Sequence, residues 1–349
     1  MKAWQLGAFG EGGDPADAIS KLVLADVPVP IAGEGDILVE IKRASINPID
    51  WKLFSAGYQG MFPIANFPYI PGFDICGTVK EVGAGVTEFA VGDLIAADTG
   101  LVESCSDPAP ASGTAGAFAE FTCVPAKLAV KVPAGVDMDS AAGLPLAGLT
   151  AYQAIFSGCL PTKSVTGEPL GNLTSGQTIL VIGGASSTGS YAVQLAKAAG
   201  ATVLTTASAN TRASGETKID FVKAMGADEV CDYKTEDWAE KFKGRNVDLI
   251  FDTVGKAEDV AKAQGVLKAG SLYVTIANFT PETVEGVTVR PFILLSNSAD
   301  LENLMDRVAS GALKVPIDSV VPFEDVPKAL SHSLSERAGG KIIIKISAT

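Results

Sequence analysis

Two patterns of apolar and polar residues divide the chain near residue 150. Before this point, short runs in which apolar and polar residues alternate, such as 36–43 and 77–83, are separated by prolines and glycines. Alternating runs bounded by turn residues are typical of β-strands in a barrel-like domain. Composition predicts a loop over 103–116, which is rich in Ser, Pro, Ala and Gly. We therefore expect a β-rich first domain.

After residue 150, apolar runs of strand length alternate with segments of helical period. The expected strands are 178–183, 202–207, 229–231, 247–252 and 271–276, and the expected helices lie near 189–199, 218–225, 236–242 and 256–264. This alternation predicts the α/β fold class, with a doubly wound parallel sheet of the Rossmann type covered by helices on both faces. The Pro- and Gly-rich stretch 159–176 is expected to be a loop.

The end of the chain completes the predicted domain organisation. A polar helix is expected near 299–310, and the apolar run 340–346 predicts a strand that could return to the first domain. We therefore assign residues 1–150 and 311–349 to the β-rich domain and residues 151–310 to the Rossmann domain.

A turn of small residues joins the first of the later strands to the helix that follows it. Its spacing is Gly183-x-x-Ser186-x-x-Gly189 rather than the strict G-x-G-x-x-G, but a strand precedes it and a helix follows. Small side chains let the backbone approach a pyrophosphate, and the helix start attracts it. The turn therefore predicts a dinucleotide site, the alternative being a glycine-rich turn of another α/β domain.

The next strand indicates which dinucleotide is bound. Folds of this type that prefer NAD carry an acid about 20 residues after the glycine turn. Here the strand ends at Ser208, and no carboxylate appears before Glu216. Ser208 and Asn210 can bind a 2′-phosphate, and Arg212 can neutralise it. NADPH is therefore the expected cofactor, unless Arg212 is an ordinary solvated loop charge.

Composition narrows the classes of partner. The chain has 349 residues, 47% of them apolar, and a net charge of −13 that is spread along the sequence. We expect no nucleic acid partner, because nucleic acid binding needs a basic patch. The sequence contains no run of 18 or more consecutive apolar residues, so we expect no membrane span. The five cysteines form no C-x-x-C pair, and the N-terminus resembles no signal or transit peptide, so we expect a cytoplasmic protein.

The residues that are rare in this chain limit its chemistry. His332 is the only histidine, and neither a Gly-x-Ser-x-Gly elbow nor a metal-ligand spacing accompanies it. A hydrolase triad or a metal centre is therefore not expected, and the nicotinamide must carry the difficult step. Hydride transfer to the β-carbon of a C=C bond next to a carbonyl suits such a site, since a few hydrogen-bond donors can hold the enolate charge.

Five ordered segments resemble the medium-chain dehydrogenase/reductase superfamily, in its quinone oxidoreductase branch. They are residues 44–52, 70–79, 91–93, 116–121 and 144–152, and the similarity continues through 226–230 and 339–342. Within the branch, the chain is most similar to plant quinone oxidoreductase homologues and fungal trans-enoyl reductases. The resemblance implies a GroES-like substrate domain beside the Rossmann domain, NADPH, and α,β-unsaturated carbonyls or quinones as small-molecule substrates.

The resemblance also implies that no metal takes part. Zinc-dependent relatives carry Gly-His-Glu where this chain has Gly72, Phe73 and Asp74, and a zinc-ligating Cys near the place of Ser45. A homodimer is possible, as in many relatives.

Site residues follow from the resemblance by position. Asn47 and Lys52 would line the cleft near the nicotinamide, and Tyr58 is a candidate proton donor. The expected cofactor contacts are Thr150, Gly184, Ser186, Ser187, Thr188, Gly189, Ser208, Asn210, Arg212, Tyr233 and Thr275. Asn47 before Pro48 is also good turn chemistry, and Lys52 could be a solvated lysine.

Two other functions are compatible with the sequence. One is a trans-acting enoyl reductase of a polyketide pathway, which would act on a carrier-tethered acyl chain. The other is an NADPH-binding protein with a structural or sensing role. The sequence does not identify the substrate, because the shape of the substrate cleft depends on the loops 57–65, 103–116 and 278–289.

Overall fold

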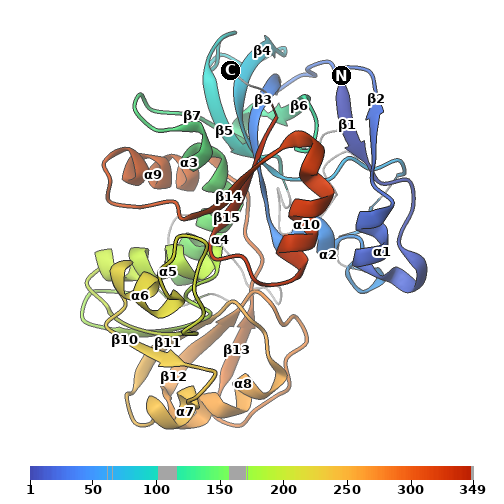
Figure 1. The fold of residues 1–349 in the computed structure, drawn as a ribbon. Coiled ribbons are helices and arrows are strands. Elements are labelled where there is room, and N and C mark those ends of the chain that lie inside the picture. The colour runs from blue at the N-terminus through green and yellow to red at the C-terminus, as the bar shows by residue number, and fades with distance from the viewer. Residues whose placement is uncertain (61, 65, 101–115, 157–169, 171, 347–349) are drawn as a thin grey trace. The chain divides into compact units, whose positions relative to one another are not determined.

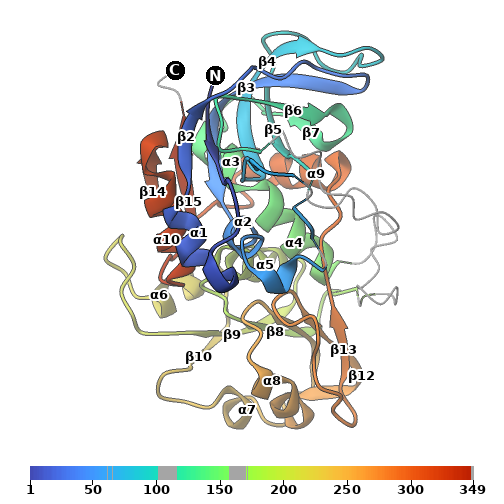
Figure 2. The same ribbon diagram turned by 90° about the vertical axis from the view of Figure 1, so that its right-hand side faces the viewer.

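The computed structural model describes residues 1–60, 62–64, 66–100, 116–156, 170 and 172–346. The chain forms two compact units (Figures 1 and 2). Unit 1 is Met1–Leu146 with Leu295–Thr349, and unit 2 is Ala147–Leu294. The loops expected at 103–116 and 159–176 lie largely outside the described residues.

Unit 1 is built on a seven-stranded sheet in the order β14-β15-β3-β4-β5-β7, with β6 paired to β3. Its strands are β3 (Asp36–Ile46), β4 (Asp74–Val82), β5 (Leu94–Asp98), β6 (Phe121–Pro125), β7 (Ala129–Lys131), β14 (Ile317–Pro322) and β15 (Lys341–Lys345). A separate two-stranded sheet pairs β1 (Lys2–Gln5) with β2 (Val23–Asp26). The C-terminal β15 runs antiparallel to β3, with Ile344 opposite Ala44.

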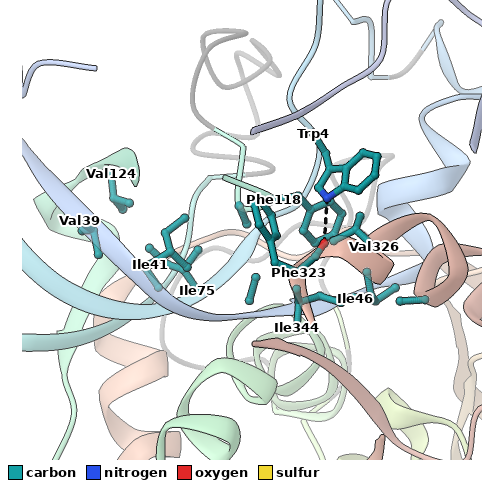
Figure 3. Packing of buried hydrophobic residues seen from close by; sticks show 14 of the residues in the cluster. Trp4, Val39, Ile41, Ile46, Ile75, Phe118, Val124, Phe323, Val326 and Ile344 are labelled. Carbon is teal, nitrogen blue, oxygen red and sulfur yellow. Dashed lines mark hydrogen bonds between the residues drawn. The ribbon is translucent and has the colours of Figure 1, made fainter. Parts of the chain in front are cut away.

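The core of unit 1 joins the two ends of the sequence. Ile41, Ile75 and Ile344 are each 0% exposed and belong to one apolar cluster (Figure 3). The indole nitrogen of Trp4 donates to the carbonyl of Phe323 at 2.9 Å. Burial of these side chains is the main source of stability for the unit.

Short helices cover unit 1 and carry several predicted site residues. They are α1 (Pro15–Ser20), α2 (Pro48–Lys52), α3 (Met138–Gly143), α9 (Ser298–Ala309) and α10 (Val326–Leu334), with 3-10 turns η1 (Glu11–Gly13), η2 (Ala56–Tyr58), η3 (Ala126–Leu128) and η5 (Phe323–Asp325). Helix α9, expected at 299–310 in the Rossmann domain, belongs to unit 1. The Ser296 hydroxyl just before it donates to Asp98 of β5 at 2.5 Å, and Leu301 and Leu304 are fully buried.

Unit 2 contains a parallel six-stranded sheet in the order β10-β9-β8-β11-β12-β13. Numbered along the chain, this is the order 3-2-1-4-5-6 of a Rossmann fold, which confirms the predicted fold class. The strands are β8 (Thr178–Ile182), β9 (Thr202–Ala207), β10 (Glu229–Asp232), β11 (Val247–Asp252), β12 (Leu267–Thr275) and β13 (Thr288–Pro291).

Helices lie on both faces of this sheet. They are α4 (Pro145–Ile155), which begins in unit 1, α5 (Ser187–Ala198), α6 (Lys218–Ala224), α7 (Trp238–Lys241) and α8 (Ala257–Lys262), followed by η4 (Ala263–Gly265). Figures 1 and 2 show α5 and α6 on one face and α7 and α8 on the other. Strand β13 was not predicted, because it is four residues long and carries a weak apolar pattern.

Candidate functional site

The turn between β8 and α5 is packed so closely that it requires glycine. Gly183 has φ +85°, and its N–H donates to the Thr206 hydroxyl at 2.9 Å. A Cβ on Gly184 would lie 2.0 Å from the Thr205 hydroxyl oxygen, and one on Gly189 would lie 2.2 Å from the Gly183 carbonyl oxygen. Glycine at these positions therefore allows the close packing of backbone at the start of a twelve-residue helix.

Ser186 caps this helix. Its hydroxyl accepts from the Gly189 N–H at 3.0 Å and lies 3.1 Å from the Thr253 hydroxyl oxygen. Ser187 and Thr188 follow in the first turn and are half-buried. The Ser186 hydroxyl therefore caps the helix, and the positive end of the helix dipole lies at this turn.

Ser208 lies where β9 ends and is 1% exposed. Its hydroxyl oxygen has no hydrogen-bond partner among the described residues. A buried hydroxyl without a partner costs about 1–3 kcal/mol, so a ligand atom that completes the bond is favoured. The neighbouring Asn210 is exposed, and its carbonyl accepts from the Lys218 N–H at 2.9 Å.

The charge of Arg212 is compensated within the protein. Its side chain is 8% exposed and forms an ion pair with Glu216. The guanidinium carbon lies 3.8 Å from the centre of the Phe221 ring. The sequence analysis expects Arg212 to neutralise a 2′-phosphate, but in the structure Glu216 supplies the negative charge beside it.

Tyr233 follows β10 and lies beside the end of β9, since its N–H donates to the Ala207 carbonyl at 3.2 Å. Tyr233 is 44% exposed. The ammonium groups of Lys234 and Lys256 lie 5.4 Å and 5.6 Å from the ring centre. Within the described residues, neither lysine has a carboxylate at ion-pair distance.

Lys234 and Lys256 were not selected by the sequence analysis. Lys256 follows the end of β11 by four residues, and Lys234 follows the end of β10 by two. The carboxyl ends of parallel strands share one edge of the sheet, so a search for cations just after each strand would have found both.

Thr275 and Thr150 are buried in unit 2. The Thr275 hydroxyl donates to Asp252 at 3.1 Å, and the other oxygen of Asp252 accepts from the Val254 N–H at 2.8 Å. These bonds fix the loop that follows β11. Thr150 is 6% exposed in α4.

In unit 1, Asn47 lies in a buried polar cluster. It is 1% exposed, its carboxamide oxygen accepts from the Lys341 ammonium at 2.7 Å, and its amide nitrogen donates to Asp74 at 2.8 Å. Asp74 also accepts from the Ser45 hydroxyl at 3.0 Å and the Leu146 N–H at 2.8 Å. The Asp74 carboxylate therefore has a partner on both oxygens.

Asp50 completes the start of α2. One of its carboxyl oxygens accepts from the Asn47 N–H at 2.7 Å, and the other has no partner among the described residues. Burial raises the pKa of Asp50 well above its ordinary value, and the nearby Asp74 acts in the same direction. The interior of unit 1 therefore favours the protonated form of Asp50 more than water does.

The side chains of Lys52 and Tyr58 lie close together. The Lys52 ammonium is 5.8 Å from the centre of the Tyr58 ring and 5.9 Å from that of Trp51. Both Lys52 and Tyr58 are half-buried. Two of the three expected catalytic side chains are thus neighbours, and Asn47 begins the helix that ends at Lys52.

Comparison with known proteins bears on both units. Residues 33–134 match the family model described as an alcohol dehydrogenase GroES-like domain, and residues 225–344 match the one described as a zinc-binding dehydrogenase. The chain is 31% identical to a chloroplast envelope quinone oxidoreductase homolog of Arabidopsis thaliana, covering 99% of this chain and 98% of the relative. It belongs to the quinone oxidoreductase branch of the medium-chain dehydrogenase/reductase superfamily.

Two further members of the superfamily show similarity over the whole chain. The NADPH-dependent alkenal/one oxidoreductase of Arabidopsis thaliana is 31% identical over 99% of this chain and 79% of its own length. The solved quinone oxidoreductase of Coxiella burnetii is 25% identical, with a TM-score of 0.80 and 99% of each chain covered. The resemblance stated from the motifs is confirmed, and the chain is an oxidoreductase of the medium-chain type with a GroES-like domain.

Further observations concern metal ligands, cysteines and membrane spans. No group of three or more His, Cys, Asp or Glu in the described residues could hold a metal ion. The Nε2 atom of His332 on α10 lies 3.0 Å from the Oδ2 atom of Asp318. Cys76, Cys123 and Cys231, the described cysteines, are free. In the same part of the chain, no helix has the length and apolar character needed to cross a membrane.

Proposed function

We propose that this protein is an NADPH-dependent, zinc-independent reductase that delivers hydride to α,β-unsaturated carbonyl compounds or quinones. The observation that carries the cofactor choice is the buried hydroxyl of Ser208, which has no hydrogen-bond partner among the described residues. Ser208 lies at the end of β9, the place where an NAD-preferring fold carries an acid. The names of the similar quinone and alkenal/one oxidoreductases support the substrate class.

The residues of unit 2 fit NADPH. The backbone at Gly184 and the start of α5, with Ser187, Thr188 and Gly189, would hold the pyrophosphate. Ser208 would bind the 2′-phosphate, and Tyr233 would pack beside it with the two lysines near its ring supplying positive charge. Asn210, Arg212 and Ser186 would shape this edge of the site, with Thr150 and Thr275 supporting it.

NADPH supplies the hydride when it is bound, and the other tasks fall to residues of this chain. In the proposed reaction, hydride adds to the β-carbon and the C=C electron pair moves toward the carbonyl oxygen. The Asn47 carboxamide, through its second N–H, stabilises the enolate oxygen. The Tyr58 hydroxyl gives its proton to the α-carbon, the Lys52 ammonium stabilises the resulting phenolate, and solvent returns the proton.

The experiment that tests this proposal measures NADPH and NADH oxidation by the purified chain with a panel of quinones, enals, enones and simple ketones. We expect saturable turnover of conjugated carbonyls or quinones with NADPH, much slower turnover with NADH, and none with simple ketones. Equal rates with NADH, or saturable NADPH binding without turnover of any conjugated substrate, would overturn the proposal. The second result would instead favour a binding or sensing role.

A further inference from the structure

The most deeply buried charges of unit 1 meet at Asn47. Lys341 and Asp74 each have side chains that are 0% exposed, and their charged atoms lie 3.1 Å apart. Lys341 opens β15, which pairs with β3, and Asp74 opens β4 on the other side of β3. The ion pair therefore joins three strands at the point where β3 leads into α2 through Asn47.

Asn47 lies between the two charges with both ends of its carboxamide bonded. The oxygen accepts from Lys341 at 2.7 Å, and the nitrogen donates to Asp74 at 2.8 Å. Turning the amide over would place its NH₂ group against the ammonium and its oxygen against the carboxylate. Only one orientation satisfies all three groups, so the pair determines which way the carboxamide faces.

This orientation leaves one hydrogen-bond donor for another task. The nitrogen carries two hydrogens, and within the described residues only Asp74 accepts from it. The backbone of Asn47 is fixed as well, because its N–H donates to Asp50 at 2.7 Å. The remaining N–H therefore has a defined direction, which a free asparagine side chain would lack.

Stability alone does not explain the pair. Desolvating two charges is expensive, and well-packed apolar residues often replace a buried ion pair without loss of stability. Asp74 already accepts from Ser45 and from the Leu146 N–H, so a neutral side chain there would still have donors. The Lys341 ammonium is the donor that the described residues offer to the carboxamide oxygen of Asn47.

We propose that Lys341 and Asp74 are positioning residues that orient the Asn47 carboxamide for stabilisation of the enolate in hydride transfer. The proposal rests on the proposed function, in which Asn47 takes part in the reaction. In the proposed reaction, Lys341 and Asp74 themselves do not touch the substrate. They act through Asn47.

The test compares Lys341→Met, Asp74→Asn and the double variant that carries both changes. Lys345→Met is the matched control, since Lys345 ends the same strand and is exposed. Each single change leaves an unpaired buried group and lowers thermal stability. The double variant removes both charges, so we expect its stability to return toward that of the wild type.

Turnover separates positioning from a purely structural role. For the double variant we expect kcat with the best conjugated substrate to fall about tenfold to a hundredfold, while KM for NADPH changes less than about threefold. Lys345→Met keeps the wild-type kcat. A double variant with wild-type stability and wild-type kcat would overturn the proposal.

A second readout does not depend on activity. We expect the side-chain amide protons of Asn47 to be protected from solvent exchange in NMR spectra of the wild type and of Lys345→Met, and to exchange rapidly and change in chemical shift in the double variant. If the wild type reduces no conjugated substrate, the proposed function fails while this readout still tests the orientation. Unchanged Asn47 signals in the double variant would contradict the positioning role.

Discussion

Ser208, Tyr233 and Asn47 show how single residues of this chain acquire roles from their surroundings. Ser208 is buried, and its hydroxyl meets no hydrogen-bond partner in the part of the chain that the structure describes, whereas Arg212, only four residues later, forms an ion pair with Glu216. The cations near the Tyr233 ring that have no carboxylate partner among the described residues are Lys234, which follows Tyr233 directly, and Lys256, which lies 23 residues later. At the residue scale, a polar side chain is therefore available to a ligand only where neighbouring residues do not already form hydrogen bonds or ion pairs with it.

A first prediction concerns these two lysines. Changing Lys234 and Lys256 together to Gln should weaken NADPH binding about tenfold, which corresponds to about 1.4 kcal/mol, because the 2′-phosphate loses its counter-charges. NADH binding should change less than twofold. Fluorescence titration with each nucleotide measures both constants, and Lys243→Gln, an exposed lysine that pairs with Glu240, is the control.

The same titration of Arg212→Gln distinguishes the two sources of positive charge. We expect this variant to lose stability through Glu216, with a smaller effect on the preference for NADPH. An Arg212→Gln variant that loses NADPH affinity more than the double lysine variant would refute the assignment of the charge to Lys234 and Lys256.

A second prediction concerns Asp50, whose pKa burial raises well above the ordinary 3.8. Between 3.8 and the raised value, the folded state binds one proton that the unfolded state does not, so the free energy of unfolding falls as pH rises. Asp50→Asn removes this dependence. The variant should be more stable than the wild type by about 1–3 kcal/mol at neutral pH, with the difference shrinking toward pH 4.

Urea unfolding at a series of pH values measures this difference. Asp26→Asn, a change at an exposed carboxylate on β2, serves as the control and should show no such trend. A difference between Asp50→Asn and wild type that grows as pH falls would mean that Asp50 is ionised in the folded protein.

At the scale of elements, the β8–turn–α5 unit shows why an imperfect glycine motif still forms. Gly183 provides the positive φ, and Gly184 and Gly189 allow contact with the next strand and with the turn backbone. Ser186 stands between them as the helix cap rather than as a third glycine. The motif's function in packing therefore needs glycine only at the positions where a Cβ would collide.

A third prediction tests this packing. Gly184→Ala should lower the free energy of unfolding by about 1–3 kcal/mol, because its Cβ would lie 2.0 Å from the Thr205 hydroxyl oxygen. Thr205→Ala removes that oxygen. The double variant should therefore lose less free energy of unfolding than the sum of the losses in the two single variants. Gly7→Ala, where nothing lies within 4 Å, is the control and should change stability by less than about 0.5 kcal/mol.

Thermal or urea unfolding of the four proteins completes the cycle. Additive effects of Gly184→Ala and Thr205→Ala would show that the turn moves away from β9 rather than colliding with it. In that case the glycine would not be required by this contact.

At the scale of the whole molecule, each unit depends on residues far apart in the sequence. Unit 1 combines the first 146 residues with the last 55, and β15 is an inner strand of its sheet, between β14 and β3. Trp4 and Phe323 are joined by a hydrogen bond across 319 positions. Unit 2 is continuous in sequence and contains every residue proposed to bind the nucleotide.

A fourth prediction follows from this arrangement. A chain that ends at Gly340 lacks β15, and with it the buried side chains of Ile342, Ile343 and Ile344. Removing three buried isoleucines costs several kcal/mol, comparable to the whole stability of a domain, so unit 1 should not fold. Circular dichroism and limited proteolysis measure this, with a chain ending at Ile346 as the control. A Gly340-terminated chain that unfolds at the wild-type temperature would contradict it.

Local periodicity explains how much of the fold could be predicted. The alternation of strand and helix after residue 150 is a property of short segments, so β8, β9 and β11 were predicted to within a residue at either end. Strand β12 begins four residues before its expected start, because its early residues pair with β11 without an apolar pattern. The turn at Gly183–Gly189 is marked by a local motif in the sequence, whereas no motif marks Lys234 and Lys256, which come near Tyr233 only in the folded chain.

The sequence by itself determined the fold class, the glycine turn and the absence of an acid near Ser208, because each of these is encoded in neighbouring residues. Only the tertiary structure decided that Arg212 is bound to Glu216, that Lys256 reaches Tyr233, and that Lys341 meets Asn47 from 294 residues away. Pairings of this kind arise when strands and helices pack. A carboxamide or a guanidinium has no partner until packing brings one within about 3 Å.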